Sequence, residues 1–99
     1  MPTVTVDLQE GFDDDVVEVW LGGEQRWRED SVTTNLAISL AASVPLEADA
    51  GESELRVAVP SRGVEATQQL AVEQDVTVAA NLAEGGLSLE PLAERPYYL

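Results

Sequence analysis

The stretch VVEVWLGGEQRWRED, from Val16 to Asp30, holds two runs of extended character separated by a pair of glycines. Val17, Val19 and Leu21 share one face of an extended chain, because successive side chains of a strand point to opposite sides. Two glycines between such runs favour a hairpin, since glycine adopts the left-handed conformations that tight turns need. The stretch therefore predicts two antiparallel strands with one buried face.

The length of the hairpin loop decides which side chains oppose the valines. A loop of two residues would set Arg26 and Arg28 against the apolar face of the first strand. A loop of three residues, from Leu21 to Gly23, instead pairs Val17 with Trp27. We expect the three-residue loop, because it directs Trp27 into the core.

Trp20 then lies on the outer face of the hairpin, beside Arg26 or Arg28. Aromatic and arginine side chains dominate the residues that contribute most to protein–protein binding. Trp20, Arg26 and Arg28 are therefore candidate partner-binding residues. The alternative is that Trp20 only packs against a neighbouring strand and stabilises the sheet.

The rest of the chain repeats this alternation, with a turn signal roughly every ten residues. The segment from Thr33 to Ala48 is the ambiguous one. It could form a helix that begins at Thr34 or Asn35 and ends at Pro45. We expect a strand instead, because apolar residues alternate from Leu36 to Leu46, with a break near 41–43. Further strands are predicted at 3–8, 54–59, 64–73, 76–82 and 87–90.

Strands of this length and spacing predict an all-β fold, a single antiparallel β-sandwich of seven to eight short strands spanning 1–99. Residues 92–99 are expected to form a C-terminal tail. Tyr97 and Tyr98 in that tail are expected to dock on the domain, because an apolar tail left free in water is unfavourable.

The pattern V-x-V-x-L-G-G, followed later by G-x-x-x-L-R-V-A-V-P, resembles small prealbumin-like or immunoglobulin-like sandwiches, including carboxypeptidase regulatory-type and PEGA-type modules. The cysteine pair of immunoglobulin domains is absent from this sequence. The resemblance implies a fold and transfers no site residue. The positions that support it are Val17, Val19, Gly23, Gly51, Leu55, Val57 and Val59.

The amino-acid composition limits the classes of partner that the chain can bind. The chain has 19 acidic and 5 basic residues, for a net charge of −14. Such a surface disfavours nucleic acids and anionic membranes as partners. All five basic residues are arginine, and this lack of lysine resembles the bias of halophiles and of some high-GC bacteria. We expect a salt-adapted acidic surface and, without an evident signal peptide or an apolar run of membrane length, a cytoplasmic protein.

Asp13, Asp14 and Asp15 form the densest acidic cluster in the sequence. A calcium loop spaces its ligands along the chain and bends at a glycine, and that spacing is absent here. Asp13 and Asp15 are therefore only weak candidates for a divalent metal site. We expect a solvated loop that keeps the edge of a sheet charged. Arg62, in a predicted turn, is expected to form a surface ion pair worth less than about 1 kcal/mol.

No catalytic group is indicated. The sequence has no histidine and no cysteine, so its serines lack the usual activating base. We expect no enzyme activity and no cofactor. The predicted function is protein interaction, with an unknown protein partner or by self-association. The alternative is a carbohydrate- or divalent-cation-binding module that uses acidic loops and Trp20.

Overall fold

The computed structural model describes residues 2–92 of the chain. They form eight β-strands and one turn of 3-10 helix, η1 (Pro60–Arg62). The predicted C-terminal tail, with the docking expected of Tyr97 and Tyr98, lies outside the described residues except for Leu92, which belongs to the last strand. The strands are β1 (Thr3–Leu8), β2 (Asp15–Leu21), β3 (Glu24–Val32), β4 (Ala42–Glu47), β5 (Gly51–Val59), β6 (Val64–Val72), β7 (Val76–Ala83) and β8 (Gly86–Leu92).

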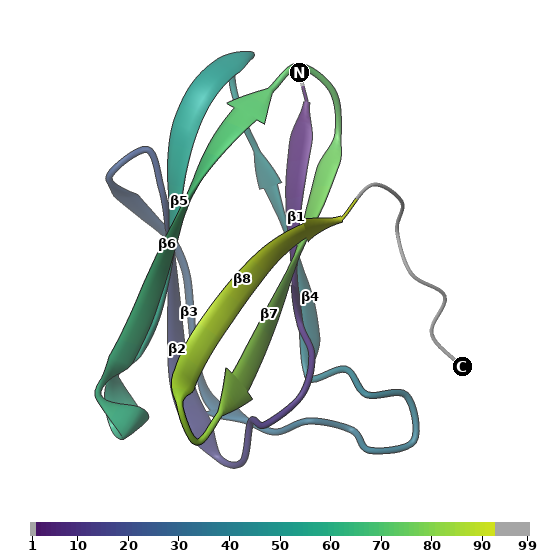
Figure 1. Cartoon of the computed structure of the whole chain (residues 1–99), viewed down its shortest axis with the longest axis vertical. Helices are drawn as coiled ribbons and strands as arrows, with labels where there is room; N and C mark the ends of the chain where they lie inside the picture. The colour runs from purple at the N-terminus through teal and green to yellow at the C-terminus, as the bar shows by residue number, and fades with distance from the viewer. Residues whose placement is uncertain (1, 93–99) are drawn as a thin grey trace.

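The strands form two four-stranded sheets, with the orders β4-β1-β7-β8 and β3-β2-β5-β6 (Figure 1). The predicted all-β class is confirmed, with eight strands among the described residues. The expectation of a purely antiparallel fold is wrong, because β1 pairs with β7 in parallel, with Val6 opposite Val78. Local alternation shows which face of a strand is buried, but parallel and antiparallel strands can share that alternation.

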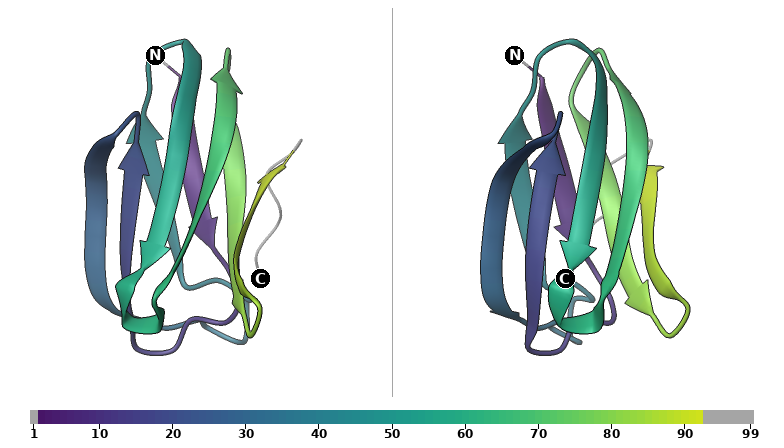
Figure 2. Two further views of the ribbon diagram at one scale, coloured as in Figure 1. Left: turned by 60° about the vertical axis from the view of Figure 1, so that its left-hand side comes forward. Right: turned by 90° about the vertical axis from the view of Figure 1, so that its left-hand side faces the viewer.

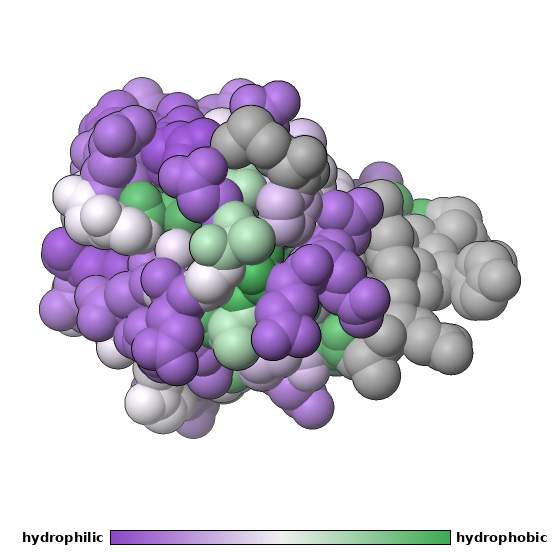
Figure 3. All heavy atoms as spheres, turned by 90° about the horizontal axis from the view of Figure 1, so that it is seen from above, coloured by the Kyte–Doolittle hydropathy of each residue, from purple (hydrophilic) through white to green (hydrophobic). Residues whose placement is uncertain are grey.

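The core lies between the two sheets, which face each other in both views of Figure 2. Alternate residues of each strand point inward, as the sequence pattern requires. Valines from both sheets are fully buried there, among them Val6 of β1, Val19 of β2 and Val57 of β5. Seen from above the view of Figure 1, much of the visible coloured surface is hydrophilic, and hydrophobic residues show near its middle (Figure 3). Within residues 2–92, no helix has the length and apolar character needed to cross a membrane.

The hairpin between β2 and β3 differs from the prediction in its turn. Leu21 pairs with Glu24, so the loop has two residues, Gly22 and Gly23, both with positive φ. This is the backbone that a tight two-residue turn needs. The expected three-residue loop is therefore wrong.

A β-bulge nevertheless places Trp27 on the apolar face. The register shifts between the pairs Trp20–Gln25 and Val19–Trp27, so Arg26 has no partner of its own on β2. Trp27 packs against the core and is half-buried. One extra residue exchanges the faces of a strand, and this is how a two-residue loop and an inward Trp27 coexist.

The ambiguous segment is a strand only in its second half. β4 begins at Ala42. Before it, a bridge between Asn35 and Leu40 closes a turn, and Leu36 within that turn is 88% exposed. The strand expected from Leu36 to the break near 41–43 is therefore wrong, and the helical alternative is not formed either. The side chain of Asn35 accepts the N–H of Ala37, a local bond that favours a turn over a strand.

Candidate functional site

Trp20 lies on the outer face of the β3-β2-β5-β6 sheet, with Gln25 beside it on β3 and Arg56 beside it on β5. It is half-buried. The guanidinium carbon of Arg56 stands 4.4 Å from the centre of the Trp20 ring. This distance falls within the range of a cation–π interaction. Trp20 was expected beside Arg26 or Arg28, but the cation stacked on it comes from a strand that follows much later in the chain.

Arg56 is held in place from its other side. Its Nη2 and Nε atoms lie 2.7 and 2.8 Å from Oε2 of Glu65 on β6. Arg56 therefore spans three strands, linking Trp20 on β2 through β5 to Glu65 on β6. Two contacts from one guanidinium restrict its orientation more than a single ion pair would.

Arg28 lies on the same face but at its edge. It stands 3.3 Å from Glu18 on the neighbouring strand and 3.3 Å from Asp30 on its own strand. We call the outer-face residues Glu18, Trp20, Arg28, Arg56 and Glu65 the tryptophan face.

The bulge separates Arg26 from the other two predicted partner-binding residues. Its Nη2 donates a hydrogen bond of 3.1 Å to the carbonyl of Glu47, the last residue of β4 in the opposite sheet. Arg26 also lines a depression of about 400 Å³ formed by the β2–β3 and β4–β5 turns. Its contacts link the edges of the two sheets, so Arg26 is not part of the tryptophan face.

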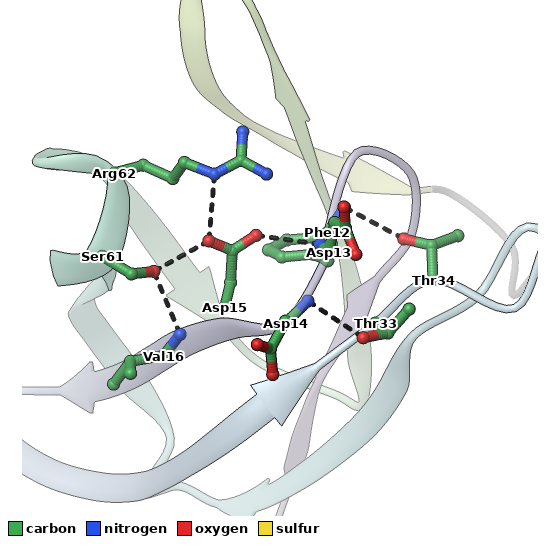
Figure 4. Close-up of polar contacts among 9 residues, drawn as sticks. All are labelled: Phe12, Asp13, Asp14, Asp15, Val16, Thr33, Thr34, Ser61 and Arg62. Atoms are coloured by element: carbon green, nitrogen blue, oxygen red, sulfur yellow. Dashed lines mark hydrogen bonds and ion pairs between the residues drawn. The ribbon is translucent and has the colours of Figure 1, made fainter.

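The Asp13–Asp15 loop is built differently from the expected solvated loop (Figure 4). Asp13 and Asp14 are exposed, but Asp15 at the start of β2 is only 2% exposed. The carboxylate of Asp15 accepts hydrogen bonds from the N–H of Asp13 at 2.9 Å, the hydroxyl of Ser61 at 2.8 Å and Nε of Arg62 at 3.0 Å. The solvated reading is therefore wrong for Asp15, whose carboxylate is the centre of a network.

The turn η1 positions both partners of Asp15. Pro60 begins the turn, and its carbonyl accepts the N–H of Gly63, so Ser61 and Arg62 are brought over the start of β2. The Ser61 hydroxyl also accepts the N–H of Val16 at 3.1 Å. We call Asp15, Ser61 and Arg62 the aspartate pin, because they fix η1 to the beginning of β2.

The surroundings of Asp15 change its acidity. Burial raises the pKa of a carboxyl group because the charged form loses hydration. The N–H of Asp13, the Ser61 hydroxyl and the Arg62 guanidinium outweigh that effect and hold the pKa of Asp15 below its ordinary value. Asp15 therefore stays charged in the folded chain at neutral pH.

The loop before Asp15 is anchored to the opposite sheet. The N–H of Leu82 on β7 donates to the carbonyl of Glu10 at 2.8 Å. Gly11 has φ +95°, and a Cβ atom there would lie 1.7 Å from the Leu82 carbonyl oxygen. The N–H of Phe12 donates to the hydroxyl of Thr34, so the loop is also tied to the segment after β3.

The two weak metal candidates, Asp13 and Asp15, do not belong to a cluster of potential metal ligands in the described part of the chain. Within residues 2–92, no group of three or more carboxylates is placed to hold a metal ion. The oxygens of Asp15 are engaged by the aspartate pin, and Asp13 contributes its backbone N–H rather than its side chain to that network.

Comparison with known proteins adds no relative. No family model, no curated protein and no solved structure matches this chain.

Proposed function

We propose that this chain is a non-catalytic protein-interaction module that binds a protein partner, or a second copy of itself, through the tryptophan face. The observation behind this proposal is the stack of Arg56 on Trp20, with Arg56 fixed by Glu65. Tryptophan and arginine are the residue types most enriched among binding hot spots. Here they lie together on the outer face of a sheet.

The arrangement of Arg56 favours recognition in a second way. Ordering a long side chain on binding costs about 0.5–1.5 kcal/mol. Contacts with Trp20 and Glu65 have already ordered much of the Arg56 side chain in the free protein. A partner that contacts this guanidinium therefore loses less affinity to side-chain ordering.

The charge of the chain supports a choice of partner and environment. We infer a cytoplasmic protein with a salt-adapted surface, and a partner that is neither a nucleic acid nor a membrane. A net charge of −14 repels phosphate groups, which argues against nucleic acids and anionic membranes as partners. Salt screens charge repulsion, including that among the chain's own carboxylates, and this is the basis for inferring a salt-adapted surface.

We also infer that the sandwich is prealbumin-like rather than immunoglobulin-like. In an immunoglobulin domain the first two strands share a sheet, and the third strand pairs within the other sheet. Here β1 and β2 belong to different sheets, and β2 lies between β3 and β5. Of the two resemblances, prealbumin-like and immunoglobulin-like, this strand order supports the prealbumin-like one.

Site-specific photo-crosslinking in living cells tests the proposed function. A photoreactive phenylalanine analogue at Gln25 would stand beside Trp20, and the same analogue at Ser88 on β8 would report on the opposite sheet. We expect a discrete crosslinked adduct from position 25 that disappears with Trp20→Ala. No adduct from position 25, or the same adduct from position 88, would contradict the proposal.

Carbohydrate binding is the alternative favoured by one observation, the outward aromatic ring of Trp20. Aromatic rings at the surface can stack on the faces of sugar rings. A soluble-oligosaccharide screen followed by the fluorescence of Trp20, with Trp20→Phe as the control, separates this alternative from protein binding. The cation-binding version has less support, because Asp15 already accepts three hydrogen bonds.

A further inference from the structure

The two sheets have four edge strands, and three of them carry features that obstruct the pairing of another strand. β3 has two register shifts against β2 and five charged residues in its nine positions. β4 has six residues and contains Pro45, and β8 contains Pro91. Bulges, charges and prolines are the devices by which natural sheets block edge pairing.

The fourth edge, β6, lacks these features. Its nine residues pair with β5 in an unbroken register, from Val64 opposite Val59 to Val72 opposite Gly51. It contains no proline, and Glu65 is its only charged residue. In the described part of the chain, no strand is hydrogen-bonded to the other side of β6.

A strand in this position offers a row of main-chain groups. Every second residue of an antiparallel edge strand directs its N–H and C=O groups away from its partner strand. An extended peptide can pair with such a row, which provides affinity through main-chain hydrogen bonds and selectivity through alternate side chains. The half-buried residues Val64, Ala66 and Gln68 lie on the inner side of this row. β8 of the other sheet approaches β6 from that side (Figure 2).

The charge around β6 indicates which peptide fits. On the outer face of β5 and β6 stand Glu52, Glu54 and Glu65, and Arg56 is the only described cation among them. Arg56 is already paired with Glu65. A second copy of the chain would bring another net charge of −14 to this edge, whereas a basic segment would be attracted to it.

We propose that β6 is a strand-addition site for an extended basic segment of a partner protein, in which basic residues alternate with apolar ones. The basic residues face Glu54 and Glu65 on the outside, and the apolar residues cover Ala66 and Gln68 on the inside. This site goes beyond the tryptophan face, with which it shares only Glu65, because it uses the main chain of β6 and not Trp20.

Hydrogen exchange measured by NMR with a model peptide tests the site. The probe is an eight-residue peptide, blocked at both ends, in which lysine and valine alternate. The matched control has the same composition in the order Lys-Lys-Val-Val, so that its charge is kept and its alternation is lost. With saturating probe, every second amide of β6 should exchange at least about tenfold more slowly, which corresponds to about 1.4 kcal/mol of protection. The amides of β3, β4 and β8 should be unchanged, and the control peptide should have no effect.

Two sets of variants keep the result interpretable. The first set is Thr67→Pro and Gln68→Pro. Because neighbouring residues of an edge strand direct their N–H groups to opposite sides, one proline removes an N–H that pairs with β5 and the other removes an N–H that faces away from β5. The variant that loses only the outward N–H should keep the fold. The folded one should lose the slowed amides. Gln69→Lys adds a positive charge on exposed β6 and should weaken probe binding about tenfold or more, whereas Gln25→Lys adds the same charge on β3 and should weaken it far less.

Three results would overturn the proposal. The first is an absence of slowed β6 amides, or their appearance on another edge strand. The second is equal binding by the control peptide, which would indicate charge attraction alone. The third is a β6 whose alternate amides are already slow in a free protein that sediments as a dimer, which would show that a second copy occupies the edge.

Discussion

Two arginines of this chain are equally exposed but hold carboxylates in different surroundings. The Arg62 and Arg56 side chains are 43% and 41% exposed, yet Asp15, the partner of Arg62, is 2% exposed, and Glu65, the partner of Arg56, is 58% exposed. Asp15 has lost its water and is surrounded by three donors. Glu65 keeps much of its water.

This difference in burial indicates that the Arg62–Asp15 pair stabilises the fold, whereas the Arg56–Glu65 pair is exposed enough to contact another molecule. Removing one member of a buried pair leaves polar groups without hydrogen bonds and costs several kcal/mol. An exposed pair contributes about 0–1 kcal/mol, because water replaces the lost contact. The aspartate pin therefore stabilises the fold, whereas the tryptophan face can exchange its contacts for those of another molecule.

The largest expected effect concerns the loop that leads to the aspartate pin. Gly11→Ala should destabilise the fold by about 4 kcal/mol, because the new Cβ clashes with the Leu82 carbonyl and the positive φ strains an alanine. Gly22→Ala, in the turn beside the tryptophan face, has open space around it and should cost about 1 kcal/mol. Urea denaturation measures both. Equal losses would contradict the close packing of Gly11.

The next effect tests the aspartate pin itself. Asp15→Ala should lower the free energy of unfolding by about 3 kcal/mol, since it leaves the Ser61 hydroxyl and the Asp13 N–H without their acceptor. Asp13→Ala is the matched control, because the Asp13 side chain is exposed, and it should change stability by no more than about 0.5 kcal/mol. A loss at position 13 as large as that at position 15 would support the solvated-cluster interpretation instead.

The pH dependence of stability follows from the same carboxylate. Because the folded pKa of Asp15 is lowered, its contribution is fully present above the unfolded pKa of about 3.9 and is lost as the pH falls through the folded value. The wild-type chain should therefore be more stable than Asp15→Asn at pH 7, and the gap should narrow as the pH falls below about 4. Urea titrations from pH 7 to pH 2 measure it. A gap that stays constant over this range would mean that Asp15 has an ordinary pKa.

Salt should stabilise the whole chain by a smaller amount. Crowded carboxylates repel at low ionic strength, and salt screens them. We expect the thermal midpoint to rise between about 0.01 M and 1 M NaCl, with most of the screening gain below about 0.15 M. A gain of about 1 kcal/mol corresponds to about 4–8 °C for a domain of this size. A flat or falling midpoint would contradict the salt-adapted surface.

The smallest effect measures the exposed pair. A double-mutant cycle on Arg56 and Glu65 should give a coupling below about 1 kcal/mol, and 1 M NaCl should reduce it. The same cycle on Arg62 and Asp15 should give a larger coupling that responds less to salt. If the two couplings are equal, burial of the carboxylate does not determine the value of an ion pair in this fold.

Alternation predicted the faces of the strands well, because it depends only on neighbouring residues. It placed Val17, Val19 and Leu21 in the core and Trp20 on the outer face, and the structure confirms each. It could not predict the extra residue Arg26 in β3, because a three-residue loop and a two-residue loop followed by a bulge both place Trp27 on the apolar face.

The contacts that define the two regions could not be predicted from local sequence. Ser61 meets Asp15 across 46 positions of the chain, and Arg56 meets Trp20 only because β5 pairs with β2. Three adjacent aspartates favour a solvated loop. Asp15 is nevertheless buried, because η1 places the Ser61 hydroxyl and the Arg62 guanidinium against its carboxylate. A short polar turn such as Pro60–Arg62 gives no indication of which strand it will meet.

The parallel pairing of β1 with β7 has a consequence for the order in which the chain can fold. β1 lies between β4 and β7, and its second neighbour follows 72 residues later, with Val76 opposite Val4. On the ribosome, the sheet β3-β2-β5-β6 can close once β6 has emerged, but β1 must wait for β7 before it is paired on both sides. Contacts that distant slow folding, since a long loop must close before they form. β1, which is synthesised before the other described strands, is thus among the last of them to be fully paired.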